Sequence, residues 1–356
     1  MTDQQTAMLE RMRQQRDWLK RHPMLHTLFW ECTLRCNLAC RHCGSSCLPE
    51  ARQKDMPLAD FLPVLDEVAQ HADPHRIIVF TVGGEPLLRP DLLECAKAIT
   101  SRGFRWGFVT NGMLLDIPML KSVVDAGVKS IAVSIDGLED DHNWMRGNAK
   151  SFSRAVRAVT LLQRTRHVAW DVITCVSRRN YPRLTELHDF LCAIGVTRWR
   201  IFTVFPAGRA KEDAEMVLSP EEFRGVMEFI KTTRAEGRLQ LSFSCEGFLG
   251  EYEGIVRGHA FRCDAGLMTA SVRYDGSISG CLSIRSNYHQ GNIYRDSFWD
   301  VWQHRFQPYR QREWMHTGSC ADCQAWRYCE GNGMHLRTDD GQLMHCNYLK
   351  LQQCDQ

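Results

Sequence analysis

The residues with the clearest chemical potential are Cys36, Cys40 and Cys43, which are spaced C-x3-C-x2-C just after the apolar run 25–30. A loop this short can direct three thiolates to three corners of a [4Fe–4S] cluster. Because such clusters usually take four cysteines, one iron would be left without a protein thiolate. An open coordination position is where a bound metal does chemistry, as in catalytic zinc sites. We therefore expect the rest of the chain to house this loop.

Composition excludes several classes of protein. The 356 residues suffice for one large domain and a smaller one, and 44% hydrophobic with 24% charged residues is ordinary for a globular protein. A net charge of +2 gives no case for a nucleic-acid partner. The polar N-terminus has no signal-peptide core, and no run of about 18 apolar residues could span a membrane. We expect a cytoplasmic protein.

The chain has 16 cysteines. In a reducing compartment they indicate metal binding or catalysis rather than a disulfide framework. Cys95, Cys175 and Cys192 lie in apolar periodic segments, where we expect small buried side chains. Twelve of the others form an N-terminal group, Cys32, Cys36, Cys40, Cys43 and Cys47, and a C-terminal group, Cys263, Cys281, Cys320, Cys323, Cys329, Cys346 and Cys354, and Cys245 lies between the two groups.

From residue 25 to about 205, strand-like runs alternate with helical patterns. The strands are expected at 25–32, 76–82, 104–110, 130–135, 168–176 and 199–204, and the helices at 58–71, 92–102, 118–126, 152–164 and 184–194. This alternation predicts an α/β fold with a parallel sheet and right-handed crossovers. Six units are two short of a full TIM-type barrel, so we predict a partial (β/α)6 barrel.

The flanking segments differ in pattern. A helix is expected at 4–20 and another at 218–237, the latter with Ser219 as N-cap. Runs 268–273 and 277–281 predict a hairpin turning at Asp275-Gly276, and the loop-rich remainder would fold around metal. The predicted organisation is an N-terminal helix (1–24), the partial barrel (25–205), a connecting helix and linker (206–260) and a small cysteine-rich domain (261–356).

Polar turns follow successive predicted strands, at the end where such barrels carry their active sites. They are Gly83-Gly84-Glu85-Pro86, Asn111-Gly112, Ser134-Ile135-Asp136 with Arg146 ten residues on, and Pro206-Ala207-Gly208-Arg209. Any one of them alone is more often a plain turn. Their succession beside a three-cysteine loop indicates a site.

With these motifs the chain resembles the radical S-adenosylmethionine (radical SAM) superfamily. The resemblance implies a [4Fe–4S] cluster on the cysteine loop, with SAM chelating the open iron through its amino and carboxylate groups. Electron transfer would then cleave SAM to methionine and a 5′-deoxyadenosyl radical, which takes a hydrogen atom from the substrate. In such enzymes the cofactor carries the hard chemistry and the protein orients and shields it.

The resemblance also assigns roles to residues. The turn 83–85 would accept hydrogen bonds from the SAM ammonium, through its backbone or through the Glu85 carboxylate. A zinc knuckle, the competing interpretation, has no use for this turn or for a barrel. Cys32 and Cys47 are expected not to be ligands. The implied ligands are Cys36, Cys40 and Cys43 for the cluster, and Gly83, Gly84, Glu85, Asn111, Ser134, Asp136, Arg146 and His42 for SAM.

The C-terminal cysteines resemble the SPASM extension of many radical SAM enzymes, which commonly binds two auxiliary [4Fe–4S] clusters. Its usual C-x2-C-x5-C-x3-C run would place a cysteine at 333, where this chain has Gly333. That position would normally bind the inner cluster with one upstream cysteine, for which Cys245 is the nearby candidate, and His335 or the substrate could fill the vacancy. Zinc sites are the alternative, and Cys354 has no assignment. The resemblance implies an outer cluster on Cys320, Cys323, Cys329 and Cys346, and an inner one on Cys263 and Cys281.

Three functions are consistent with these features. The first is a maturase that abstracts a hydrogen atom from a peptide or protein and takes its electron from a donor such as flavodoxin or ferredoxin. The run 29–36 resembles a subgroup of uncharacterised SPASM enzymes, some associated with small lipoproteins. The second is a radical SAM oxidoreductase for a small molecule, such as a haem-type cofactor or a sugar alcohol. The third is a non-enzymatic iron–sulfur or zinc redox protein.

Overall fold

A single ten-stranded sheet organises the computed structural model, which describes residues 1–51 and 53–354. The strand order is β10-β9-β8-β1-β2-β3-β4-β5-β6-β7. Neighbouring strands from β8 and β1 through to β7 are parallel, and β9 and β10 are antiparallel to their neighbours. The strands are β1 (Thr27–Thr33), β2 (Ile78–Gly83), β3 (Arg105–Thr110), β4 (Val128–Ser134), β5 (Ala169–Val176), β6 (Arg198–Thr203), β7 (Gln240–Phe243), β8 (Thr269–Val272), β9 (Ser277–Ser279) and β10 (Gly291–Asn292).

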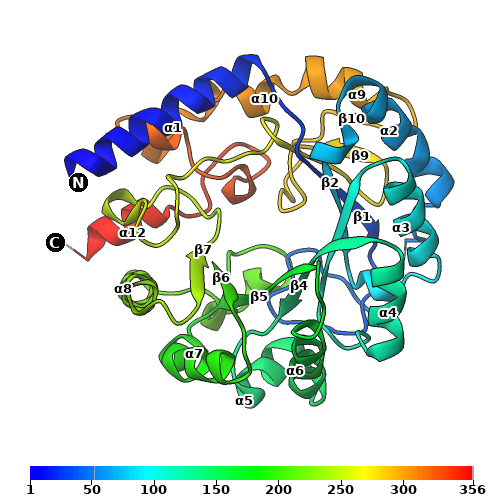
Figure 1. Ribbon diagram of the computed structural model, residues 1–356. Helices are drawn as coiled ribbons and strands as arrows, with labels where there is room; N and C mark the ends of the chain where they lie inside the picture. The colour runs from blue at the N-terminus through cyan, green and yellow to red at the C-terminus, as the bar shows by residue number, and fades with distance from the viewer. Residues whose placement is uncertain (52, 355–356) are drawn as a thin grey trace.

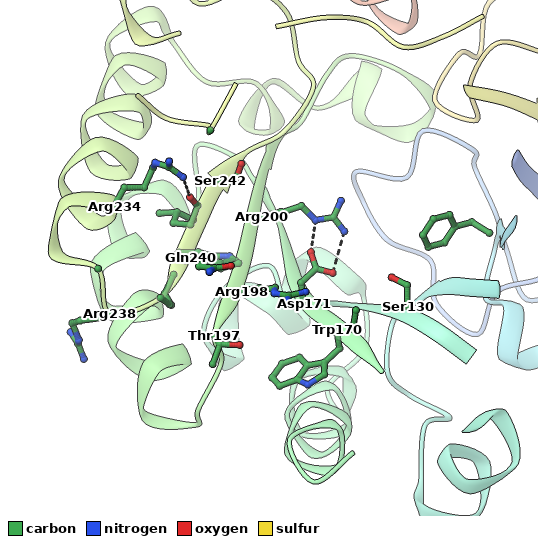
Figure 2. Close-up of a pocket in the computed structure, with 17 residues that line it drawn as sticks. Ser130, Trp170, Asp171, Thr197, Arg198, Arg200, Arg234, Arg238, Gln240 and Ser242 are labelled. Atoms are coloured by element: carbon green, nitrogen blue, oxygen red, sulfur yellow. Dashed lines mark hydrogen bonds and ion pairs between the residues drawn. The ribbon is translucent and has the colours of Figure 1, made fainter. Parts of the chain in front are cut away.

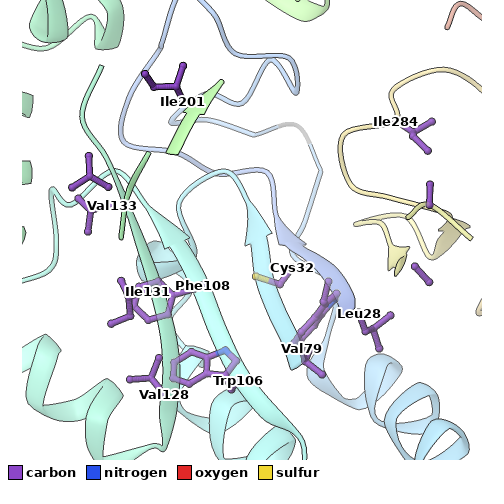
Figure 3. Packing of buried hydrophobic residues seen from close by; sticks show 14 of the residues in the cluster. Leu28, Cys32, Val79, Trp106, Phe108, Val128, Ile131, Val133, Ile201 and Ile284 are labelled. Atoms are coloured by element: carbon purple, nitrogen blue, oxygen red, sulfur yellow. The ribbon is translucent and has the colours of Figure 1, made fainter. Parts of the chain in front are cut away.

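Helices cover the outer face of this sheet one after another, as Figure 1 shows from α2 round to α8. They are α2 (Leu58–His71), α3 (Leu92–Ser101), α4 (Ile117–Asp125), α5 (Glu139–Arg146), α6 (Ser151–Leu162), α7 (Leu184–Ala193) and α8 (Pro220–Glu236). The main core lies between sheet and helices, with Leu28, Trp106 and Ile131 fully buried (Figure 3). Parallel sheets need such cover because their hydrophobic strands cannot face water.

The predicted α/β architecture is confirmed, with the six predicted strands found as β1 to β6. The helix predicted at 218–237 is α8, which begins with a capping box between Ser219 and Glu222 and ends at Gly237 in the left-handed conformation. Between residues 25 and 260, one α-helix and one strand were not predicted. One is α5; the other is β7, a further parallel strand inside the segment 206–260.

The C-terminal part is joined to the barrel through the sheet. The predicted hairpin forms β8 and β9, and β8 pairs in parallel with β1 from Thr27–Thr269 to Trp30–Val272. Beyond it the chain has short elements only, namely α9 (Phe298–Asp300), α10 (Gln307–Arg310), α11 (Trp326–Cys329) and α12 (Asn347–Gln353).

The N-terminal helix α1 (Asp3–Arg21) packs against this C-terminal part (Figure 1). Leu9 and Met12 form a small core with Phe248 and Phe261. Arg16 donates to the carbonyl of Tyr328 over 2.6 Å. The first helix therefore packs on the cysteine-rich region and stabilises it. None of the helices in residues 1–51 and 53–354 is long and apolar enough to cross a membrane.

We predict that Leu9→Ala lowers the free energy of unfolding by about 2 to 5 kcal/mol, because it empties a fully buried position. Urea denaturation followed by tryptophan fluorescence would measure the change. Ile117→Ala is the matched control, since Ile117 is 70% exposed and its truncation should change stability little. An equal effect of both substitutions would contradict the packing role of α1.

Candidate functional site

The cysteine loop leaves the C-terminal end of β1 and lies against the turn that follows β2. The amide of Gly84 donates to the Thr33 carbonyl and that of Glu85 to the Arg35 carbonyl, each over 2.8 Å. A Cβ on Gly84 would lie 2.0 Å from the Arg35 carbonyl oxygen. Gly83 has φ +125°, which side chains rarely adopt. The two glycines thus let the β2 turn hold the start of the loop by its backbone.

The turn after β6 holds the other end of the loop. The Arg209 guanidinium donates from Nε to the Cys40 carbonyl over 2.7 Å and from Nη1 to the Cys47 carbonyl over 3.0 Å. A Cβ on Gly208 would lie 2.3 Å from the Cys43 carbonyl oxygen. The sequence indicated this turn as part of a site but not that Arg209 binds the loop, since the contact joins residues 169 positions apart.

The thiols of the loop are free, as are all 16 cysteines. Asn111 Nδ2 lies 3.9 Å from Cys36 Sγ, and Arg146 Nη1 lies 3.8 Å from Cys40 Sγ. Burial raises the pKa of Cys36 to about 12. A hydrogen bond from the thiol of Cys47 lowers the pKa of Cys43. These thiols are therefore not joined in disulfides, and those of Cys36 and Cys40 each have a polar donor nearby.

Cys32 and Cys47 differ in their surroundings. Cys32 lies in the main core, with Sγ 3.6 Å from the Val82 carbonyl (Figure 3). Cys47 packs in the same small cluster as Cys36 and Cys40. The core position of Cys32 fits its predicted status as a non-ligand, whereas Cys47 neighbours Cys43 directly.

A buried ion pair lies beside the loop, between strands β4 and β5. Arg146 Nε, at the end of α5, donates to Asp136 Oδ2 over 2.6 Å. Burial alone would raise the pKa of Asp136, but Arg146, together with His42, His142 and the Cys175 amide, lowers that pKa to about 2. His42 Nε2 lies 4.0 Å from Asp136, and burial lowers the pKa of His42 to about 4. The imidazole is therefore neutral beside a charged pair.

Cys175 and Asn180 complete the surroundings of Asp136 and were not predicted as site residues. The amide of Cys175 donates to Asp136 Oδ1 over 2.9 Å, and Asn180 Nδ2 donates to the Asp136 carbonyl. The predicted residue Ser134 lies buried at the end of β4. Apolar neighbours hid Cys175 in the sequence, where it has the pattern of a core residue.

The carboxylate of Glu85 binds mainly to donors of the protein itself. Its carboxylate accepts from Thr110 Oγ1 and the Asn111 amide, each over 2.8 Å, and from the Leu87 amide over 3.2 Å. A carboxylate has about four acceptor positions, so most of its capacity joins β2 to β3. Burial raises the pKa of Glu85 to about 7, although these donors oppose the change.

Four C-terminal cysteines line one cavity. Cys320, Cys323, Cys329 and Cys346 come from three separate segments and face the same space. Arg337 Nη2 donates to Cys320 Sγ over 3.3 Å. This is the set that the sequence predicts for the outer auxiliary cluster.

A second group is formed by Cys245, Cys263 and Cys281. Cys245 is exposed as a residue, but desolvation of its thiol, followed by the proximity of Cys281 and Cys263, raises its pKa to about 12. Burial likewise raises the pKa of Cys281 to about 11. The structure thus brings the distant Cys245 to the predicted pair. Cys354 lies apart, with its thiol at the Lys350 carbonyl.

A large cavity of about 1100 Å³ lies at the other end of the strands (Figure 2). It is lined by the beginnings of β4 to β7 and contains the ion pair of Arg200 with Asp171. The cysteine loop and the Asp136–Arg146 pair lie at the C-terminal strand ends instead. This cavity is therefore separate from the cysteine site.

Protein-family models match two parts of the chain. The model of the radical SAM superfamily matches residues 30–191, and that of the SPASM iron–sulfur cluster-binding domain matches residues 263–324. The chain belongs to the radical SAM superfamily. It is a radical SAM enzyme with a SPASM domain, and its cofactors are SAM and [4Fe–4S] clusters.

Related proteins differ in what they act on. The chain is 27% identical to the AdoMet-dependent heme synthase of Methanosarcina barkeri over 321 residues, which is 85% of this chain and 89% of the relative. It is 28% identical to the mycofactocin maturase MftC of Mycolicibacterium smegmatis over 313 residues, 86% of this chain and 77% of the relative. A solved structure, native anSMEcpe with bound AdoMet and Cp18Cys peptide, has a TM-score of 0.71 at 18% identity, covering 93% of this chain and 95% of that one.

The cysteine site fits a cluster with SAM beside it. Free thiols accompany buried polar atoms that have no partner among the described residues, including Arg209 Nη2 and His42 Nδ1. Such atoms are costly unless a bound group satisfies them. The radical SAM domain therefore has both the thiolate donors and the spare hydrogen-bonding capacity that the cofactors require.

We predict that Gly84→Ala reduces the iron and sulfide bound by the cysteine loop, because its Cβ would displace the Arg35 carbonyl. Metal analysis after anaerobic reconstitution would measure the loss, and the electron paramagnetic resonance (EPR) signal would assign it to the loop cluster. Gly258→Ala is the control, as a Cβ there meets nothing within 4 Å. Full iron in Gly84→Ala would show that the close contact is unnecessary.

Proposed function

We propose that this enzyme abstracts a hydrogen atom from a peptide or protein at the C-terminal ends of its parallel strands. The observation that carries the proposal is the cysteine loop clamped between the turns after β2 and β6, with the Asp136–Arg146 pair beside it. Bound there, cluster and SAM supply a 5′-deoxyadenosyl radical once an electron arrives from a donor such as flavodoxin or ferredoxin. Cys36, Cys40 and Cys43 would hold the cluster.

The residues around the loop would bind and orient SAM. Arg146 carries its positive charge beside Cys40, where a guanidinium can pair with the carboxylate of SAM. Asp136 fixes that guanidinium from the opposite side. Ser134, Asn111 and His42 would complete the pocket, with the backbone of 83–85. Glu85 would act through the Asn111 amide, which it holds in place.

The substrate would lie between the radical SAM domain and the SPASM domain. The ring of Phe205, in the turn after β6, contacts His335 of the SPASM domain with ring centroids 5.2 Å apart. Phe205 also lies close to Gly44 of the cysteine loop. The two domains therefore meet next to the loop, where a substrate could contact both.

Two lines of similarity bear on the substrate class. A peptide or protein is supported by the maturase MftC, and by the fold of anSMEcpe, which was solved with a bound peptide. A haem-type tetrapyrrole is the second candidate, because the chain covers most of several heme synthases. The shared chemistry is hydrogen-atom abstraction from a carbon of the substrate.

We predict that the reduced, anaerobically reconstituted protein forms 5′-deoxyadenosine from SAM, and that Cys40→Ala abolishes this because the cluster loses a ligand. Liquid chromatography with mass detection would quantify the product. Cys354→Ala is the matched control and should retain activity, since that thiol lies at the end of α12. Absence of 5′-deoxyadenosine from the parent protein would contradict the proposed chemistry.

Coexpression with short neighbouring open reading frames would then identify the substrate class. We expect a mass change in a coexpressed peptide that requires Cys40. Incubation with iron-coproporphyrin III, a compound in the name of one relative, is the parallel arm. A Cys40-dependent change in the tetrapyrrole alone would favour the second candidate, and a peptide change that persists in Cys40→Ala would reject the assignment.

A further inference from the structure

Gly333 stands where the SPASM pattern has a cysteine, and its surroundings explain the glycine. Its backbone has φ −70° and ψ 136°, which any residue can adopt. The constraint is instead spatial, because a Cβ on Gly333 would lie 2.7 Å from Cε1 and 2.9 Å from Nδ1 of His335. The imidazole of His335 therefore occupies the space into which a side chain at 333 would project.

Gly333 also lies next to the backbone of Cys245. A Cβ on Gly333 would be 3.8 Å from the Cys245 carbonyl oxygen. Arg257, fully buried, holds the turn around Cys245 by donating to the carbonyls of Ser244 and Gly247. Gly247 in turn packs so tightly on Asn332 that a Cβ would lie 2.2 Å from its Oδ1. The segments 244–247 and 332–335 are thus fixed side by side.

Arg312 connects Cys263 to the segment 332–335. This buried guanidinium donates from Nη1 to the Asn332 carbonyl over 3.3 Å and from Nη2 to the Cys263 carbonyl over 3.4 Å. The thiols of Cys245, Cys263 and Cys281 lie within electrostatic range of one another. The segments that carry three thiols and one imidazole therefore meet in this region.

The ring nitrogens of His335 make no hydrogen bond to another residue within 1–51 and 53–354, so both are free to bind a ligand. Its one described aromatic neighbour is Phe205. Imidazole is an established ligand of iron–sulfur clusters, as in Rieske centres.

We propose that His335 is the fourth ligand of an inner [4Fe–4S] cluster whose other ligands are Cys245, Cys263 and Cys281. The ligand lost at position 333 is replaced from position 335, whose ring fills the vacated space. This inference rests on the SPASM domain and not on the identity of the substrate. A neutral imidazole in place of a thiolate would make the inner cluster easier to reduce.

The test uses the full chain carrying Cys36→Ala, Cys40→Ala and Cys43→Ala, so that auxiliary clusters alone are observed. The protein is reconstituted anaerobically, with and without ¹⁵N-labelled histidine, and studied by pulsed EPR after reduction. We expect the nitrogen coupling of a directly bound imidazole, altered by the label. His335→Ala should remove it, and His345→Ala, at a neighbouring buried histidine, should leave it unchanged.

A conservative variant protects the test against misfolding. His335→Cys should retain the iron of both auxiliary clusters, lose the nitrogen coupling and shift one reduction potential to a lower value. Gly333→Cys combined with His335→Ala should also restore four thiolates. The proposal is overturned if the parent shows no imidazole coupling, if iron analysis finds the outer cluster alone, or if the coupling survives in His335→Cys. These measurements do not depend on turnover, so failure to find a substrate would not affect them.

Discussion

The structure depends on satisfying the backbone of a short loop that cannot satisfy itself. Residues 36–43 form no helix or strand that would pair their carbonyl groups. Buried carbonyls need donors, and Arg209 supplies them from outside to the carbonyls of Cys40 and of Cys47 just beyond the loop. The amide of Arg41 in turn donates to the Met145 carbonyl at the end of α5. The segments that follow the C-terminal ends of several parallel strands must therefore lie next to the loop for it to keep its conformation.

The charges buried beside the cysteine loop neutralise each other. Asp136 and Arg146 are both buried, and an isolated buried charge would cost several kcal/mol. Their pairing, with the Cys175 amide and Asn180 as further donors, removes that cost. A buried pair of this kind adds little net stability but defines where a charged ligand can bind. This explains why the end of α5 must reach the cysteine loop.

The residues that could be predicted are those whose signal is local. Apolar runs located β1 to β6, Ser219 and Gly237 marked the ends of α8, and cysteine spacing separated the groups of thiols that the structure brings together. The helix α5 was missed because it is short and begins with Glu139-Asp140-Asp141, without apolar periodicity. β7 has four residues only. The roles of Arg209, Arg312 and Glu85 arise from contacts between distant segments, which spacing along the chain does not encode.

Position 333 shows how a departure from a family pattern can be interpreted physically. A missing cysteine alone indicates either a lost cluster or a substituted ligand. The two outcomes predict different surroundings: a lost cluster leaves the remaining thiols free to drift apart, whereas a substituted ligand keeps them together and fills the vacated space. Arg312 joins the carbonyls of Cys263 and Asn332, Gly247 packs on Asn332 beside Cys245, and the His335 ring fills the space beside Gly333. The close packing around Gly333 therefore favours substitution of the ligand over loss of the site.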